Sequence, residues 1–432
     1  MIMSMIRPET EMKDTGIEWI GNIPSSWVCC KQKYVISLIN GRAFKDTEFE
    51  EDGKYRILRV GNFFSNPKWY SSNLELEDDK YCYNGDLLYA WSMSYGPYIW
   101  NGEKVIYHYH IWKAKLLNNL SKRFAYYYLI ALSDSIKSDV HETTMSFITM
   151  KSMNNSYIAF PEDIFEQQAI ADYLDETCSK IDEIIAEAKA SIDEHKELKQ
   201  SVIFEAVTKG LDKNVEMKDS GVEWIGEIPV DWNIAKINRV AWTTSGATPL
   251  RSKETEYYDN AVIRWVRTLD LNNGHVTDSS EKITETALKN SSCSIMPVKT
   301  VCVAMYGGSG TIGKSGILEV ECATNQAICS IVSDKKVLNP DYLHYVIMAV
   351  RKYWMKYAVG TRKDPNINQQ IIAQMRIPIP QLSKQDIIVN HLDKVTDKCD
   401  SLIAEKESLI NDLEAYKKSL IYEVVTGKRR VV

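Results

Sequence analysis

The sequence predicts an α+β fold built as a tandem repeat of two similar halves, each a mixed α/β body followed by one long helix. Three observations lead to this prediction: a motif repeated at the start of each half, a block without Pro or Gly repeated at the end of each half, and short strand-like apolar runs between them. The composition permits it, because 432 residues with 44% hydrophobic and 25% charged side chains can form two or three domain cores.

The repeated motif opens each half of the chain. Residues 12–27 read MKDTGIEWIGNIPSSW, and residues 217–232 read MKDSGVEWIGEIPVDW, with 11 identical positions among 16. Chance does not produce an internal match of this quality, so the repeat has to be recognised before the fold is assigned. The two copies of the motif, at residues 12 and 217, mark the start of two halves of the chain.

The repeated tails predict two long helices. Residues 165–208 and 383–426 align without gaps, contain no Pro or Gly, and are rich in Ala, Leu, Glu and Lys. A 4-3 spacing of apolar residues favours a coiled-coil-like helix pair, and neighbouring isoleucines such as Ile185, Ile192, Ile403 and Ile410 widen the apolar stripe. Two separate helices, each on its own body, are the alternative. The main apolar members of the predicted seam are Ile170, Leu174, Ile181, Ile184, Leu198, Val202, Ile388, Leu392, Val395, Leu402, Leu409, Leu413 and Leu420.

Charge is distributed unevenly along the chain. Residues 162–213 carry 14 acidic and 6 basic side chains, whereas residues 1–161 carry 18 of each and residues 214–380 carry 17 acidic and 19 basic. A solvated helix face explains the acidic segment. The near-neutral bodies remove any argument for nucleic-acid binding from total charge, since phosphate neutralisation requires Lys and Arg gathered on a surface.

Nothing in the sequence indicates secretion, a membrane span or a metal site. The N-terminal residues lack a secretory signal, no apolar run reaches the roughly 18 to 20 residues that span a bilayer, and the nine cysteines are scattered. We therefore expect reduced thiols and a cytoplasmic protein. His108 and His110 lack a third ligand and are interpreted as packing or polar surface residues.

A phosphate-loop pattern occupies residues 308–315, with Gly308, Gly313, Lys314 and Ser315 at the required positions. A working loop needs a helix to begin at its Lys-Ser, because the helix amides help to hold the phosphate. Here Gly316 follows, and the next residues alternate like a strand. The sequence thus predicts a glycine-rich turn between two strands.

A second local pattern, NPDY at residues 339–342, is similar to the Asn-Pro-Pro-Tyr motif of adenine methylases. Asp341 replaces the proline that shapes that turn. The segment instead predicts a helix capped by Asn339 with Pro340 in its first turn. Neither a methylase site, nor a Ser/His/Asp set, nor a nuclease carboxylate cluster is identified.

Taken together, these features resemble the specificity subunit of type I restriction-modification systems. The resemblance rests on MKDSGVEWIGEIP, on paired bodies with turns such as GTIGK, and on PEDIFEQQAIADYLD leading into a long helix. It covers the chain from about residue 12 to residue 428. The first 11 residues lie outside the pattern, and SYGPYIW replaces the GTIGK turn in the first body.

The resemblance implies an architecture and a division of labour. Residues 12–160 and 217–380 would be two α/β target-recognition domains, each reading one half of an asymmetric bipartite DNA target. Residues 163–210 and 383–428 would be conserved helices that pack antiparallel as a spacer and dock methylation subunits. An approximate two-fold axis would relate the halves. AdoMet, ATP and magnesium would be bound by methylation subunits, expected to number two, and by restriction and translocation subunits, so this chain would be non-catalytic and hold no cofactor.

Candidates for DNA contact are polar or basic residues on turns next to strand-like runs, because Arg, Asn and Gln can discriminate base edges. In the first body they are Arg42, Lys45, Arg59, Asn62, Ser92, Ser94, Tyr95, Thr143 and Thr144. In the second body they are Arg251, Lys253, Arg267, Ser309, Thr311, Lys314, Arg362, Lys363, Asn366 and Asn368.

Three function classes remain open from the sequence. The leading hypothesis is a non-catalytic DNA-specificity subunit that acts with methylation and restriction subunits on double-stranded DNA. The alternatives are a nucleotide hydrolase that uses the loop at 308–315 and a coiled-coil adaptor that joins proteins without reading DNA.

Overall fold

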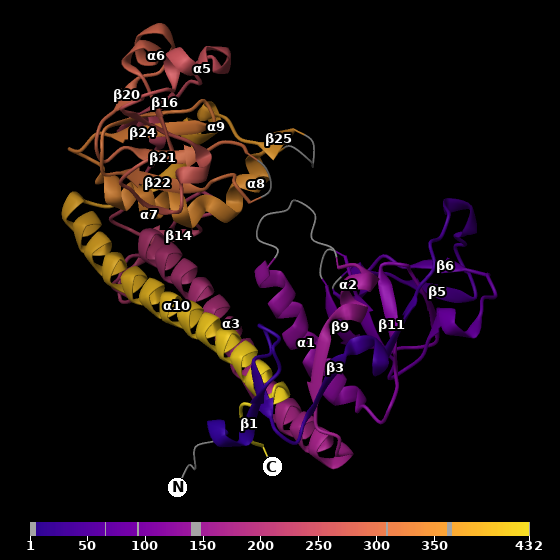
Figure 1. Cartoon of the computed structure of the whole chain (residues 1–432). Coiled ribbons are helices and arrows are strands. Elements are labelled where there is room, and N and C mark those ends of the chain that lie inside the picture. The colour runs from indigo at the N-terminus through magenta and orange to yellow at the C-terminus, as the bar shows by residue number, and fades with distance from the viewer. Residues whose placement is uncertain are drawn as a thin grey trace. The chain divides into compact units, whose positions relative to one another are not determined.

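The structure is a computed structural model that describes residues 6–64, 66–92, 95–139, 148–307, 310–360 and 365–431. It divides into two compact units (Figure 1). Unit 1 comprises Met1–Ala188 and Glu407–Val432, and unit 2 comprises Lys189–Lys406. Each unit therefore holds one globular body and part of each of the two long helices.

The body of unit 1 contains two four-stranded sheets. One has the strand order β6-β5-β10-β7, in which β10 runs parallel to β5, and the other is antiparallel with the order β4-β11-β8-β9. Two short antiparallel pairs, β1-β2 and β12-β3, complete the body. The strands are β1 (Met12–Asp14), β2 (Asn22–Pro24), β3 (Val28–Lys31), β4 (Ile36–Asn40), β5 (Tyr55–Leu58), β6 (Tyr70–Ser72), β7 (Tyr81–Cys82), β8 (Leu87–Ala90), β9 (Gly96–Ile99), β10 (Val105–Tyr107), β11 (Ile111–Leu116) and β12 (Tyr157–Phe160); the helices are α1 (Lys122–Asp139) and α2 (Met150–Asn155).

The body of unit 2 repeats this plan with one more strand in its larger sheet. The sheet orders are β19-β17-β23-β20 and β16-β24-β21-β22-β18, beside the pairs β13-β14, β15-β27 and β25-β26. The strands are β13 (Met217–Asp219), β14 (Glu227–Pro229), β15 (Asn233–Lys236), β16 (Ala241–Ser245), β17 (Ile263–Val266), β18 (Gly274–Val276), β19 (Glu281–Ile283), β20 (Ile295–Met296), β21 (Val301–Ala304), β22 (Ser315–Leu318), β23 (Cys322–Thr324), β24 (Ile328–Ser333), β25 (Val359–Gly360), β26 (Pro365–Asn366) and β27 (Arg376–Ile379). The helices are α4 (Ile237–Val240), α5 (Glu254–Tyr257), α6 (Glu285–Asn290), α7 (Pro340–Val350), α8 (Trp354–Tyr357) and α9 (Gln369–Gln374).

Strand β21 shows how the larger sheet of unit 2 is covered on both faces. Val301 and Val303 belong to the core that contains α7, whereas Cys302 and Ala304 belong to a second core shared with β17, β20 and β23. Successive side chains of a strand point to opposite faces, so the sheet lies between the helix α7 and the smaller sheet. An almost continuously apolar strand is the sequence signature of such double coverage.

The repeated motif folds into the same hairpin in both units. In β1-β2 Met12 pairs with Pro24, and in β13-β14 Met217 pairs with Pro229. Trp27 and Trp232, which end the motif, are both buried. The sequence repeat thus reports a repeated structural element.

The predicted helices are α3 (Ile164–Lys209) and α10 (Leu382–Val425). In unit 1 Lys417 on α10 pairs with Asp182 on α3, and in unit 2 Lys199 on α3 pairs with Asp400 on α10, each with an Nζ–Oδ2 distance of 2.6 Å. From the first ion pair to the second, the chain advances on α3 from Asp182 to Lys199 but runs back on α10 from Lys417 to Asp400. The two helices are therefore antiparallel, as predicted. In the gap-free alignment of the tails, these two ion pairs are also equivalent to each other.

The predicted seam is correct at its start and wrong in phase further along. Ile170, Leu174 and Ile181 are buried, as are Ile388, Leu392 and Leu420, while Val202, Val395, Leu402 and Leu413 are half-buried. Three predicted members are wrong: Ile184 is 45% exposed, Leu198 is 53% exposed and Leu409 is 44% exposed.

The neighbouring residues Ile185, Lys199 and Ile410 take the inward positions that were predicted for these three. Ile184–Ile185 and Leu409–Ile410 are adjacent apolar pairs, so a heptad spacing fits either of two neighbouring phases there, whereas Lys199 lies inward to pair with Asp400. Packing against the other helix selects one of them.

Candidate nucleic-acid interface

Equivalent arginines follow an inner strand of the sheet β6-β5-β10-β7 in unit 1 and of the sheet β19-β17-β23-β20 in unit 2. Arg59 comes directly after β5 and Arg267 directly after β17, and each precedes a short 3-10 turn. The Asn62 side chain accepts from the Arg59 amide at 3.0 Å, and the Asp270 side chain accepts from the Arg267 amide at 2.7 Å. This local capping fixes both arginines at the end of a strand, with the guanidinium free to point away from the turn.

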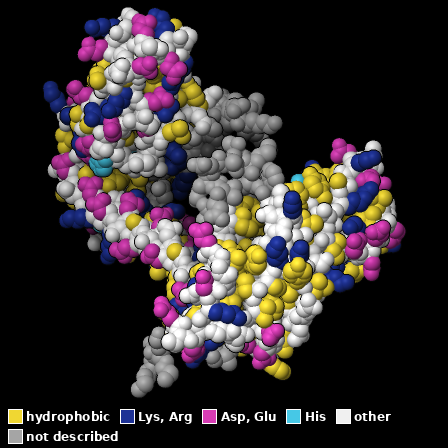
Figure 2. Space-filling view, viewed as in Figure 1, with side chains coloured by type: hydrophobic (Ala, Val, Ile, Leu, Met, Phe, Trp, Pro, Cys, Tyr) yellow, Lys and Arg dark blue, Asp and Glu magenta, His cyan; other side chains and the backbone are white. Residues whose placement is uncertain are grey.

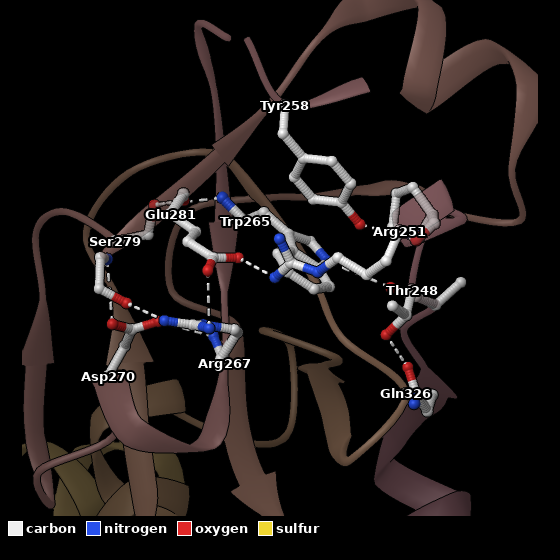
Figure 3. Close-up of polar contacts among 12 residues, drawn as sticks. Thr248, Arg251, Tyr258, Trp265, Arg267, Asp270, Ser279, Glu281 and Gln326 are labelled. Atoms are coloured by element: carbon white, nitrogen blue, oxygen red, sulfur yellow. Dashed lines mark hydrogen bonds and ion pairs between the residues drawn. The ribbon is translucent and has the colours of Figure 1, made fainter. Parts of the chain in front are cut away.

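In unit 2 the arginine is held in a polar network (Figure 3). Glu281 on β19 accepts from Arg267 Nη1 at 2.9 Å and also pairs with Arg251. The guanidinium of Arg251 lies over the ring of Tyr258, 4.2 Å from its centre, and over Trp265. One carboxylate therefore orients two predicted DNA-contact arginines and offsets one of their two positive charges, and a planar guanidinium needs such orientation for bidentate recognition.

In unit 1 the same position is open and carries no carboxylate. A pocket of about 180 Å³, called here the cationic pocket, is lined by Arg59, Val60, Gly61, Asn62, Asn66, Lys68, Tyr70, His108 and His110. Tyr70 pairs with Ile57 of β5, and Glu281 pairs with Trp265 of β17. Because Ile57 and Trp265 each lie two residues before the strand-end arginine, Tyr70 takes the place that Glu281 has in unit 2. Arg59 and Lys68 both lie over the ring of Tyr70, at 5.0 Å and 4.9 Å from its centre.

The histidines reach this pocket through the parallel pairing of β10 with β5. The His108 amide donates to the Leu58 carbonyl at 2.9 Å, which places the turn after β10 beside the turn that follows β5. In unit 2 the Asn325 amide makes the same bond to Val266 at 3.0 Å. Asn325 and Ala327 thus stand where unit 1 has His108 and His110.

The pocket keeps both imidazoles in the neutral form. Burial, the neighbouring His110 and the charge of Arg59 lower the pKa of His108 to about 4. Burial and Arg59 lower the pKa of His110 as well. A cation next to an imidazole disfavours a second positive charge, so the pocket holds two uncharged histidines near neutral pH until an anion compensates Arg59.

A glycine brings the segment after β4 close to this pocket. A Cβ on Gly41 would lie 2.3 Å from the His108 carbonyl oxygen, and a Cβ on the equivalent Gly246 would lie 1.9 Å from the Thr324 carbonyl oxygen. Only glycine allows this approach of two backbone segments. Arg42 follows directly, and its guanidinium forms two bonds to Glu48, at 3.0 and 2.6 Å.

The other predicted contact residues are scattered. Lys45 is exposed, Ser92 is half-buried and Tyr95 is buried. In unit 2 Lys253 is exposed and pairs with Glu256, Lys314 is half-buried and Asn366 is exposed. Two predicted residues serve local structure: Thr311 is buried and donates to the Gly307 carbonyl at 3.0 Å, and Asn368 caps α9. Six predicted residues lie outside the described part of the chain, namely Ser94, Thr143, Thr144, Ser309, Arg362 and Lys363.

Sequence reasoning missed several members of both sites. Lys68, Tyr70 and Glu281 were not singled out, and His108 and His110 were interpreted as packing or polar surface residues. The two histidines at alternate positions were the only available signal, and nothing nearby in the sequence links them to Arg59.

The phosphate-loop pattern is a hairpin, as predicted. Strands β21 and β22 pair antiparallel, with Val303 opposite Ser315. Ser315 is fully buried, and a Cβ on Gly313 would lie 2.3 Å from Trp354. A strand begins where a phosphate loop needs a helix. The prediction for NPDY is also confirmed, because Asn339 caps α7 by accepting from the Asp341 amide at 2.8 Å.

Charges of both signs are mixed over the face seen in Figure 2. On the face seen in Figure 2, Lys and Arg side chains alternate with Asp and Glu in both units. Among the described residues, no group of three His, Cys, Asp or Glu side chains could hold a metal ion, and no helix has the length and hydropathy to cross a membrane.

Each unit also has a surface groove beside its helix pair, and the two grooves are equivalent. In unit 1 the Tyr127 hydroxyl donates to Asp175 at 2.5 Å, and in unit 2 the Tyr345 hydroxyl donates to Asp393 at 2.7 Å. The remaining lining includes Ile130, Cys178, Asp182 and Lys417 in unit 1 and Met348, Thr396, Asp400 and Lys199 in unit 2.

Comparison with known proteins agrees with this architecture. The chain is 22% identical to the type I restriction enzyme EcoBI specificity subunit of Escherichia coli, over 99% of this chain and 91% of that protein. It is 25% identical to the MjaVIII specificity subunit of Methanocaldococcus jannaschii, over 80% of this chain and 79% of that protein.

A solved structure, described as the structural basis of complex assembly and conformational transition of the type I R-M system, contains a chain of the same fold. The TM-score is 0.71 at 12% identity, over 94% of this chain and 99% of that one. The family described as "Type I restriction modification DNA specificity domain" matches residues 24–194 and 229–412. The chain therefore belongs to the type I restriction-modification DNA specificity family.

Proposed function

We propose that this chain is the non-catalytic DNA-specificity subunit of a type I restriction-modification complex and that its two bodies read different halves of one asymmetric target. The observation that carries the proposal is a repeated scaffold with unlike residues at equivalent positions around the strand-end arginines. Tyr70, His108 and His110 of unit 1 stand where unit 2 has Glu281, Asn325 and Ala327. Two bodies with the same backbone fold but different side chains are expected to recognise different base sequences.

The helices would fix the distance between the two half-sites. Two antiparallel helices of 46 and 44 residues would form this spacer, and half-sites read by a two-fold arrangement are spaced on the scale of a DNA turn, roughly 34 Å. The equivalent grooves beside the helix pair would each dock one methylation subunit, which supports two copies in the complex. AdoMet, ATP and magnesium would be bound by these partners and by the restriction and translocation subunits.

The nucleotide-hydrolase alternative has little support in the geometry. Strand β22 begins at Ser315, where a phosphate loop needs a helix, and Ser315 is fully buried. We expect Lys314→Ala to leave nucleotide turnover by the purified chain at background.

The decisive experiment exchanges residues 25–160 for the corresponding body of another family member. The exchanged chain is produced in cells with its methylation subunits, and the methylated sites are mapped by sequencing. We expect one half of the methylated motif to change while the other half stays the same. An unchanged motif would leave the adaptor alternative, and a change in both halves would contradict independent reading by the two bodies.

A further inference from the structure

The cationic pocket of unit 1 has charges that no described side chain neutralises. Neither Arg59 nor Lys68 forms an ion pair with a carboxylate in the described part of the chain, and no residue that lines the pocket is acidic. In unit 2 the equivalent Arg267 is paired with Glu281 at 2.9 Å. An exposed pair of cations around a concave surface favours an anionic ligand.

The side-chain amides of Asn62 and Asn66 already form hydrogen bonds to the backbone near the pocket. The Asn62 oxygen accepts from the Arg59 amide, and its nitrogen donates to the Lys68 carbonyl at 3.1 Å. The Asn66 oxygen accepts from the Lys68 amide at 3.0 Å. Adenine and cytosine present amino groups that need an acceptor, and both carboxamide oxygens already accept one bond from the turn. The charged groups that remain are donors, which suit the oxygens of a phosphate.

We propose that the cationic pocket binds a backbone phosphate of the DNA, held by Arg59 and Lys68, with His108 and His110 as further donors. This assignment rests on the proposed function and adds a division of roles to it. Unit 1 uses its strand-end arginine to anchor the backbone, whereas unit 2 keeps the equivalent Arg267 paired with Glu281 and oriented.

Phosphate binding would change the protonation of the histidines. An anion in the pocket compensates Arg59 and favours the imidazolium form, so the complex takes up protons as it forms. Affinity therefore rises as the pH falls through the pKa values of the bound state. The charged and titratable groups that surround the imidazoles are Arg59, Lys68, Tyr70, Tyr109, and Arg42 with its partner Glu48.

The first test measures the salt dependence of binding to a random-sequence duplex of about 30 base pairs, since backbone contacts do not depend on sequence. We expect Arg59→Ala and Lys68→Ala in the full chain each to weaken binding about tenfold and to reduce the salt slope by about one. Lys68→Arg keeps the charge and is expected to restore the slope. Thermal unfolding confirms that each variant is folded.

Arg267→Ala is the matched control, because it removes the equivalent arginine of unit 2. We expect it to weaken binding to the random duplex less than Arg59→Ala does, since the Arg267 guanidinium already shares the carboxylate of Glu281. Equal losses for Arg59→Ala and Arg267→Ala would contradict the division of roles.

The second test maps the methylated motif of cells that carry Arg59→Ala. A backbone contact weakens binding to all sequences equally, so the motif stays unchanged while the extent of methylation falls. Relaxation at one base pair would assign Arg59 to a guanine edge and overturn the proposal. Failure of the wild-type chain both to bind duplex and to direct methylation would instead reject the proposed function.

The third test follows duplex affinity between about pH 6 and pH 8, the range in which histidines respond to an added anion. We expect tighter binding at the lower pH in the wild type and a smaller pH dependence in the double variant His108→Asn, His110→Ala, which carries the residues of unit 2. His275→Asn is the control for an exposed histidine outside the pocket. An equal pH dependence in all three proteins contradicts the role of the two histidines.

A competition arm distinguishes DNA phosphate from free phosphate. Inorganic phosphate is added to the complex and compared with chloride at equal ionic strength. We expect only the general salt effect on duplex binding. Displacement specific to inorganic phosphate and lost in Arg59→Ala would identify a free-anion site and overturn the assignment to the DNA backbone.

Discussion

The two bodies share strand order, capping and a strand-end arginine, yet they surround that arginine with opposite chemistry. Unit 1 places Arg59 beside Lys68 and two histidines, and unit 2 places Arg267 against Glu281. The shared part is backbone geometry, which sets where a side chain can act. The different part is the side chain on the neighbouring strand, which sets charge. A duplicated recognition fold can thus diversify its reading without changing its frame.

The largest expected effect tests whether the shared frame is equally stabilised in both units. Leu174 on α3 and Leu392 on α10 are equivalent in the repeat and fully buried. We expect Leu174→Ala and Leu392→Ala each to lower the free energy of unfolding by about 3 kcal/mol, through lost packing and a residual cavity. Urea unfolding of the full chain measures it.

Leu198→Ala, at a position 53% exposed, is the control for this pair and should change the free energy of unfolding little. A loss at Leu198 as large as that at Leu392 would show that the predicted seam, and not the observed one, describes the protein.

The next prediction concerns the stability of the chain at low pH, to which the two units contribute differently. Burial, helped by the charges of His275, Lys199 and Lys299, lowers the pKa of His344 in unit 2 to about 3. The unfolded chain binds this proton near pH 6.5, so stability falls as the pH drops from about 6.5 toward 3, by about 2 kcal/mol at about pH 5. The equivalent residue of unit 1 is Tyr126, whose pKa burial raises, so it does not titrate there.

We therefore expect His344→Gln to reduce the loss of stability between neutral pH and about pH 5, measured by urea unfolding of both proteins at each pH. Comparison with the wild type removes the contribution of the carboxylates. An identical pH dependence would mean that His344 is protonated in the folded chain.

A smaller effect sharpens the contrast between the arginines. Glu281→Gln removes the carboxylate that pairs with Arg251 and Arg267, so affinity for a random duplex should rise about threefold, with a steeper salt dependence. Arg59→Ala in unit 1 should act in the opposite direction. Fluorescence anisotropy at several salt concentrations measures both, and a fall in affinity for Glu281→Gln would show that Glu281 does not limit backbone binding.

The smallest effect concerns the equivalent ion pairs between the helices. Asp182 and Asp400 are both 58% exposed, so the pairs Lys417–Asp182 and Lys199–Asp400 are well solvated. Double-mutant cycles with alanine should give coupling energies of a few tenths of a kcal/mol in both units. A coupling above about 2 kcal/mol in one unit alone would indicate a different dielectric environment along one part of the helix pair.

The sequence was sufficient for the elements that repeat and insufficient for the contacts that differ. Gap-free alignment of the tails predicted α3 and α10, and the repeated Trp-ended motif predicted the two halves. The phase of the seam failed at Ile184 because Ile185 is equally apolar and only the opposing helix distinguishes them. Arg59 and Arg267 were named from local clusters. Their partners His108 and Glu281 come from strand pairings that no local pattern specifies.

The central claim is that one backbone fold, present twice in the chain, recognises two different DNA half-sites. Grafting residues 28–160 over residues 233–379 gives both units the same body, joined at equivalent strand pairs, Val28 with Phe160 and Asn233 with Ile379. Sequencing of methylated DNA from cells with this chain and its methylation subunits should then show an inverted repeat of the half-site that unit 1 reads. A folded chain whose motif remains asymmetric, or contains neither original half, would contradict the account.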